Sequence, residues 1–209
     1  MKSGYTHIAI VLDRSGSMQS CIADTIGGFN AFIEEQKKVP GEATLTLVQF
    51  DDAYESVHVG LPLKDIPALK FEPRGSTALL DAIGKTINDQ GLWLSVKHEH
   101  DRPEKVIFVI ITDGHENASR EFTRDKIFQL IRQQESQYQW QFVFIGANQD
   151  AIAAGAQIGV YSDSALTYDA RRPRAAFAAL ASSVRAVRSG AMARASFTAD
   201  DRKRNKPSS

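Results

Sequence analysis

The sequence lacks several features that mark secreted, membrane-spanning or nucleic-acid-binding proteins. Its 209 residues include a single cysteine, Cys21, which excludes an internal disulfide and favours a reducing compartment. With 25 basic and 25 acidic residues the formal net charge is zero, so no global field favours nucleic acid or an anionic membrane. No apolar run approaches the length of a membrane-spanning helix, and the block 106–111 is of strand size.

The length and composition suit a globular protein. A chain of 209 residues with 43% hydrophobic content can bury a full core as one domain and is short for two. Residues 1–4 lead straight into the first apolar block and leave no room for a secretory signal ahead of the fold. We therefore expect a soluble, cytoplasmic protein.

Apolar blocks of two different periodicities alternate along the chain. Short β-branched and aliphatic blocks predict strands, and apolar residues spaced three and four apart predict amphipathic helices. The predicted strands are 7–12, 43–50, 54–59, 105–111, 141–145 and 166–168, and the predicted helices follow 13–18, begin near 77, and span 122–136, 151–156 and 172–188. This order predicts an α/β fold with a doubly wound, mostly parallel sheet, one antiparallel edge strand (54–59) and helices on both faces.

The C-terminal part of the chain differs from the rest in composition. We expect residues 1–190 to form one domain, with the helix over 172–188 packed on the sheet. Residues 191–209 contain little apolar content and are basic, and we expect them to form a flexible tail. Such a tail can contact nucleic acid, but a solvated chain end is the interpretation we adopt.

A polar hexapeptide, residues 13–18, lies where the first predicted strand passes into a helix. Asp13, Ser15 and Ser17 bring three oxygen-bearing side chains into one tight loop, and Gly16 lets the backbone turn between them. This position is the carboxyl edge of the predicted sheet, where open α/β sheets bind ligands. Carboxylate and hydroxyl oxygens are hard donors, so the loop favours Mg²⁺, Mn²⁺ or Ca²⁺ over a soft metal.

At these residues the sequence resembles the von Willebrand factor A family. Asp13, Ser15 and Ser17 match the Asp-x-Ser-x-Ser motif of that family's metal-ion-dependent adhesion site. Thr77, in Gly-Ser-Thr-Ala, matches its lone threonine, and Asp113, in Ile-Thr-Asp-Gly, matches the aspartate that closes the site. The resemblance covers about residues 5–168 and implies the Rossmann-like topology of the family.

The resemblance also implies a function. By the family's pattern the hydroxyls of Ser15, Ser17 and Thr77 bind Mg²⁺ directly, with Mn²⁺ or Ca²⁺ as alternatives, while Asp13 and Asp113 act directly or through water. A cation held by neutral hydroxyls attracts an anionic oxygen, so the expected partner is an Asp or Glu carboxylate of another protein. We expect the rim of this binding face to include Arg14, Arg74, His115, Glu116 and Asn148.

The sequence also resembles stand-alone A-domain proteins of bacteria and phages, including those associated with tellurium resistance. That likeness implies an intracellular scaffold or adaptor in a stress or defence complex, in some cases with an ATPase partner. We expect no membrane and no nucleic-acid partner.

Three alternatives to a metal-dependent binding module remain open from the residues. Asp13, Ser15 and Thr77 could be helix caps, and Asp113 could belong to an ordinary turn. A Mg²⁺-dependent phosphoryl-transfer or hydrolytic enzyme is a second alternative, with His115 and Glu116 as candidate bases. Such enzymes usually carry an acid–base carboxylate two positions after the first aspartate, where this chain has Ser15. Nucleic-acid binding through the C-terminal Arg/Lys segment is the third. We expect the protein not to be an enzyme.

Overall fold

The fold is built on a central mixed sheet. The computed structural model describes residues 1–147 and 150–207, which form a six-stranded sheet in the order β3-β2-β1-β4-β5-β6. The strands are β1 (Lys2–Asp13), β2 (Glu42–Phe50), β3 (Tyr54–Pro62), β4 (Pro103–Thr112), β5 (Gln141–Ala147) and β6 (Ala165–Tyr168). Strand β3 runs antiparallel to β2 at one edge, and the other neighbouring strands pair in parallel.

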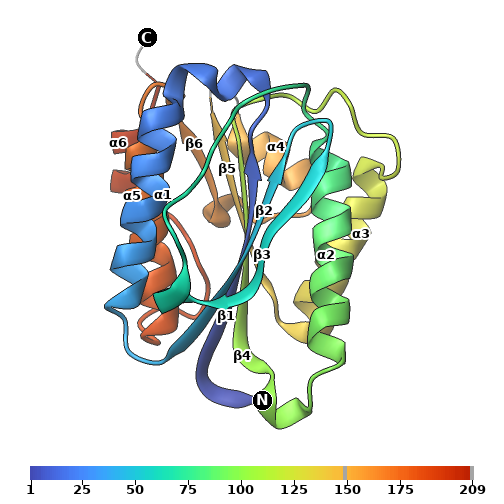
Figure 1. Cartoon of the computed structure of the whole chain (residues 1–209), viewed down its shortest axis with the longest axis vertical. Coiled ribbons are helices and arrows are strands. Elements are labelled where there is room, and N and C mark those ends of the chain that lie inside the picture. The colour runs from blue at the N-terminus through green and yellow to red at the C-terminus, as the bar shows by residue number, and fades with distance from the viewer. Residues whose placement is uncertain (148–149, 208–209) are drawn as a thin grey trace.

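Helices cover both faces of this sheet (Figure 1). On one face lie α1 (Ile22–Lys37) and α5 (Pro173–Arg188), with α6 (Ala199–Asn205) beside them, and on the other face lie α2 (Leu79–Ser95), α3 (Arg124–Tyr138) and α4 (Ala151–Gln157). Short 3₁₀ helices span Gly16–Cys21 (η1), Leu63–Asp65 (η2), Glu99–Asp101 (η3) and Ser162–Ser164 (η4). The predicted fold class, a doubly wound sheet with one antiparallel edge strand, is confirmed.

The central strands are apolar on both faces because both faces are covered. In β1, Ile8 and Ile10 belong to the core under α1 and α5, whereas Ala9 and Val11 belong to the core under α2 and α3, and all four side chains are fully buried. A strand buried on both sides reads in sequence as a continuous hydrophobic run rather than an alternating one.

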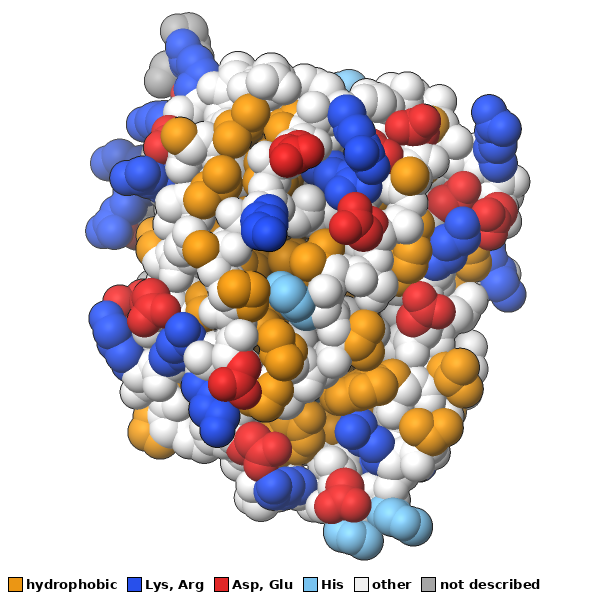
Figure 2. All heavy atoms as spheres, viewed as in Figure 1, with side chains coloured by type: hydrophobic (Ala, Val, Ile, Leu, Met, Phe, Trp, Pro, Cys, Tyr) orange, Lys and Arg blue, Asp and Glu red, His pale blue; other side chains and the backbone are white. Residues whose placement is uncertain are grey.

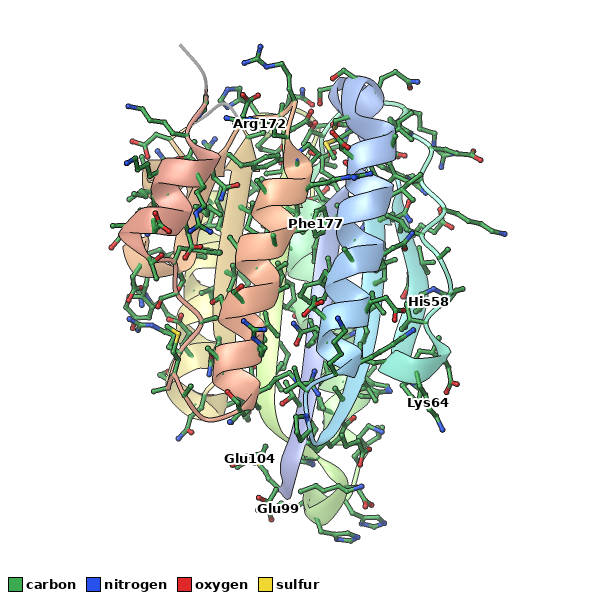
Figure 3. The ribbon with its side chains drawn as sticks, turned by 90° about the vertical axis from the view of Figure 1, so that its left-hand side faces the viewer. His58, Lys64, Glu99, Glu104, Arg172 and Phe177 are labelled. Carbon is green, nitrogen blue, oxygen red and sulfur yellow. The ribbon has the colours of Figure 1, made fainter. Side chains whose placement is uncertain are left out.

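Helices α1 and α5 pack closely over the first core. A Cβ on Gly28 of α1 would lie 2.5 Å from Cδ2 of Phe177, so a larger residue would push the helices apart. Figure 3 shows Phe177 on α5, facing this junction with α1. The prediction that the helix over 172–188 packs against the sheet is therefore confirmed.

The connections place a ligand crevice at one end of the sheet. From β1 the chain winds first to β2 on one side and later to β4 on the other, so the strand order reverses between β1 and β4. Ligands of open α/β sheets bind outside the carboxyl ends of strands at such a reversal. This is the upper end in Figure 1, and Figure 3 shows Arg172 at this end and Glu99 and Glu104 at the opposite one.

The C-terminal segment differs from its prediction. The expectation of a flexible tail is wrong for residues 199–205, which form α6 with a capping box between Thr198 and Asp201. Asn205 is buried, and the Arg202 guanidinium donates hydrogen bonds to the Ala165 and Ser162 carbonyls, which fixes the helix against β6. None of the helices in the described part of the chain is both long and apolar enough to cross a bilayer.

Candidate metal centre

Asp13 ends β1 with a carboxylate that has no exposed surface. Its Oδ1 accepts a hydrogen bond from the Ser15 amide at 2.7 Å, and its Oδ2 accepts one from Thr112 Oγ1 at 2.6 Å. Burial raises the pKa of the Asp13 carboxyl, and the hydrogen bonds from Thr112 and Ser15 oppose that rise. The carboxylate is thus held in one orientation at the carboxyl edge of the sheet.

The hydroxyls of Ser15 and Ser17, in the loop after Asp13, link this loop to the end of β4. Ser15 Oγ lies 3.0 Å from Ser17 Oγ, and Ser17 Oγ donates a hydrogen bond to Asp113 Oδ1 at 2.5 Å. Because Asp113 directly follows β4, this contact joins the loop after β1 to the loop after β4. Ser15 is buried and Ser17 is exposed, so the row of oxygens runs from the interior to the surface.

Thr77 reaches the same place from a third loop, just before α2. Its amide donates to Asn117 Oδ1 at 3.0 Å, and its carbonyl accepts from the Asn117 and Ala118 amides. A Cβ on Gly114 would lie 2.7 Å from Thr77 Oγ1 and 3.5 Å from Ser15 Oγ. The Thr77 and Ser15 hydroxyls therefore both lie close to Gly114, where any larger residue would displace Thr77.

The site holds two carboxylates and no compensating cation among the described residues. Burial raises the pKa of the Asp113 carboxyl to about 6, with a further contribution from the charge of Asp13 and an opposing one from the Ser17 hydrogen bond. Neither carboxylate forms an ion pair with any described residue. A divalent cation at this position would neutralise both, because an opposite charge favours the ionised form.

The donor chemistry fits a hard cation. Within the described ranges no group of three or more His, Cys, Asp or Glu side chains comes together, so a carboxylate or imidazole cage is absent there. What the three loops do bring together is oxygen: the hydroxyls of Ser15, Ser17 and Thr77 with the two carboxylates. Such a set suits Mg²⁺, Mn²⁺ or Ca²⁺. The structure thus gathers all five residues that the sequence proposed as ligands, and metal binding by them stays a prediction.

Comparison with known proteins rests on structure. No protein-family model and no curated protein matches the sequence. The fold is similar to that of proximal thread matrix protein 1 (PTMP1) from the mussel byssus with a zinc-occupied MIDAS motif, at 17% identity and a TM-score of 0.58 over 90% of this chain and 46% of that one. It is also similar to VWA2, an ArnB paralog of Sulfolobus acidocaldarius, at 18% identity and a TM-score of 0.56 over 87% of this chain and 45% of that one.

A third similar structure is the vWF domain of the pilus tip protein Mfa5 from Porphyromonas gingivalis, at 11% identity and a TM-score of 0.59 over 86% of this chain and 94% of that domain. The fold is that of a von Willebrand factor A domain. The chain spans less than half the length of the PTMP1 and VWA2 chains and nearly all of the Mfa5 domain.

Of the two arginines expected on the rim of this site, one is buried and the other is exposed. Arg14 is 6% exposed, and its guanidinium is turned to Asp51, with Nε 2.8 Å from Oδ2, and to Glu55. The expectation that Arg14 lies on an exposed rim is therefore wrong: the Asp51 and Glu55 carboxylates draw the guanidinium inward. Arg74 keeps 60% of its side chain exposed while its Nε donates to the same Asp51 oxygen at 2.9 Å.

The other rim candidates lie on or near the loop that follows β4. His115 is exposed beside the site. Glu116 is anchored, because its carboxylate accepts hydrogen bonds from the Leu80, Ala118 and Ser119 amides and from the Ser119 hydroxyl. Asn148 lies outside the described residues.

Sequence reasoning missed four residues that shape this site. Thr112 and Asn117 orient Asp13 and Thr77 by hydrogen bonds, and Gly114 leaves room for the threonine hydroxyl. Asp51 binds both arginines of the neighbouring loops. A signal existed for Asp51 and Thr112, since each lies at the carboxyl end of a central strand, where ligand-binding side chains of such sheets collect.

Proposed function

We propose that this A domain is a metal-dependent protein-binding module that presents a divalent cation, Mg²⁺ in the first instance, to an acidic residue of a protein partner. One observation carries the proposal: two carboxylates, Asp13 and Asp113, lie among three hydroxyls with no positively charged described residue bound to either of them. The energetic cost of burying such charges falls when a cation is bound.

The donor set also supports the nature of the partner group. Three of the five candidate ligands are neutral hydroxyls, so a bound ion keeps much of its attraction for an anionic oxygen. Ser17 and Gly16 are exposed, which leaves the outer side of the site open to a group from another molecule. PTMP1, which has a similar fold, carries zinc in its MIDAS motif, and this supports a divalent cation in the present site.

The contacts of Glu116, one of the two candidate bases, and the presence of Ser15 favour a binding role over catalysis. The carboxylate of Glu116 accepts hydrogen bonds from amide and hydroxyl donors of its own loop and of α2, and these contacts give it a structural role in anchoring the loop. Ser15 stands where an acid–base carboxylate would be needed. We keep a non-enzymatic scaffold or adaptor in the cytoplasm of a bacterium or phage-infected cell as the proposed context, with an ATPase as one candidate partner.

Calorimetric titration with Mg²⁺, Mn²⁺ and Ca²⁺ tests the metal site directly. The wild-type chain should bind at least one of them at a single site, and Thr77→Ala should bind more weakly because one hydroxyl ligand is lost. Ser76→Ala is the matched control, since it removes the hydroxyl of the exposed neighbouring residue, which lines a cavity together with Asp52 and Lys85. A wild-type chain that ignores all three ions would overturn the proposal.

The open coordination position is tested on the Mn²⁺-loaded protein. Water-proton relaxation should report exchangeable water on the bound ion, and acetate or an acidic peptide should displace that water. The same peptide with Gln in place of Glu is the control. Displacement by both peptides alike would contradict recognition of a carboxylate.

A further inference from the structure

Asp51 lies beside the metal centre without being one of its oxygen donors. It directly follows β2 and is 1% exposed. Its Oδ2 accepts hydrogen bonds from Arg14 Nε at 2.8 Å and from Arg74 Nε at 2.9 Å, and its Oδ1 accepts one from the Ala53 amide at 2.6 Å. One buried carboxylate thus binds two arginines that belong to two different loops of the site.

The two arginines flank the residues that supply the hydroxyls. Arg14 stands between Asp13 and Ser15, and Arg74 stands three residues before Thr77. The carboxylate of Asp51 binds both arginine side chains at the end of β2, a strand with a neighbour on each side in the sheet.

Backbone hydrogen bonds join the same three segments. The Arg74 amide donates to the Arg14 carbonyl at 2.8 Å, and the Gly16 amide donates to the Gly75 carbonyl at 3.2 Å. The Asp51 carbonyl accepts from the Ala78 amide, next to Thr77, at 2.9 Å. Asp51 therefore contacts the loop that carries Thr77 at two places: its side chain binds Arg74 before Thr77, and its carbonyl binds Ala78 after it.

The cluster is not arranged for stability alone. Arg14 Nη2 is buried and has no hydrogen-bond partner among the described residues, which is an unfavourable state for a donor. Buried ion pairs are in general weak evidence for stabilisation. Figure 2 shows basic and acidic side chains side by side on the upper part of one face, at the end of the sheet where β2 and β3 meet.

We propose that Asp51 is a positioning residue for the metal centre: by binding Arg14 and Arg74 together, it holds the Asp13–Ser17 loop and the Thr77 loop at the separation that a divalent cation requires. The inference rests on the proposed metal-binding function. Asp51 then shapes the geometry of the site without contacting the ion.

The sharpest test is Arg74→Ala, because positioning and simple electrostatics predict opposite signs. Removing a positive charge near a cation site should tighten binding if charge alone matters. If Arg74 holds the threonine loop, its removal should instead weaken Mg²⁺ binding by about tenfold, the scale seen when groups that orient metal ligands are lost. Arg120→Ala is the matched control, since it removes an exposed arginine of the 113–122 loop that has no ion pair among the described residues.

Stability of the metal-free protein separates positioning from general damage. Since Arg74 is largely exposed, its loss should shift the metal-free Tm by no more than about 4 °C. Asp51→Asn should weaken Mg²⁺ binding in the same direction, with Asp52→Asn, the exposed neighbour, as its control. Unchanged or tighter binding in Arg74→Ala, with a wild type that binds Mg²⁺, overturns the positioning role alone. A wild type that binds no divalent ion overturns both proposals.

Discussion

The affinity of the site for Mg²⁺ should depend on pH, with a midpoint set by Asp113. Metal ligands must be deprotonated to bind, and burial together with the charge of Asp13 raises the pKa of Asp113 to about 6. The carboxyl is then about nine-tenths ionised at pH 7 and about one-tenth ionised at pH 5. Apparent affinity for Mg²⁺ should accordingly fall by about tenfold between these two values and change little above pH 7.

The raised pKa of Asp113 also affects the metal-free protein: its free energy of unfolding should decrease as pH rises, whereas the affinity for Mg²⁺ should increase. A carboxyl whose folded pKa lies above its unfolded value of 3.8 stabilises the fold at low pH, and that stabilisation is lost as pH rises through about 6. Two pKa units correspond to at most about 3 kcal/mol, and the partial exposure of Asp113 reduces this to about 1–2 kcal/mol. At pH 7 the metal-free protein should therefore be more stable as Asp113→Asn than as wild type, and the difference should vanish near pH 4.

Calorimetric titration with Mg²⁺ from pH 5 to 8 measures the first effect, and urea denaturation of the metal-free wild type and Asp113→Asn measures the second. His115→Gln is the control for binding, because it changes an exposed side chain two residues after Asp113 and leaves Asp113 in place. A wild-type affinity that stays flat from pH 5 to 7, with no gain in stability for Asp113→Asn at pH 7, would refute the reasoning.

Three further outcomes are expected. Asp13→Asn should abolish Mg²⁺ binding in calorimetry. The Tm of the metal-free variant should equal or exceed that of wild type, because the substitution removes a buried charge and keeps the shape of the side chain. A lower Tm would contradict this. Gly114→Ala should weaken Mg²⁺ binding, since its Cβ would meet Thr77 Oγ1 at 2.7 Å, whereas Gly91→Ala, in open space on α2, should keep the affinity and raise stability by about 0.5–1 kcal/mol. Burial lowers the pKa of His7 to about 4, so its contribution to unfolding free energy should fall by about 3 kcal/mol as pH drops from 6.5 to 4, and His7→Gln should lose that slope in urea denaturation.

The parts of the fold that the sequence could predict are those decided by burial. Strand β4 is apolar on both sides because helices cover both faces of the sheet, and that requirement is visible in the sequence as an unbroken run. The edge position of β3 follows from its alternating apolar and polar residues. By contrast α6 has no apolar face, and it depends on its capping box and on the contacts of Arg202 and Asn205, which periodicity does not reveal.

The candidate ligands were also predictable, but their supports were not. Asp13 and Asp113 follow central strands, so their residue type and position in the chain already suggest a site. The direction of the Arg14 side chain depends on the carboxylates of Asp51, just after β2, and Glu55, in β3, which lie far from Arg14 in the sequence. The arginine partners of Asp51 belong to loops 23 and 37 residues away, so the local sequence does not reveal these contacts.

The contacts at the beginning of helix α2 affect how strongly the binding of an acidic partner depends on the metal ion. A helix start is ordinarily an attractive place for an anion, because its first amides point outward without acceptors. Here the chain's own Glu116 takes the Leu80 amide and Ser119 takes the Asp81 amide. A visiting carboxylate finds those donors already taken and must rely on the cation. Chelation should therefore release an acidic partner completely instead of leaving it loosely attached.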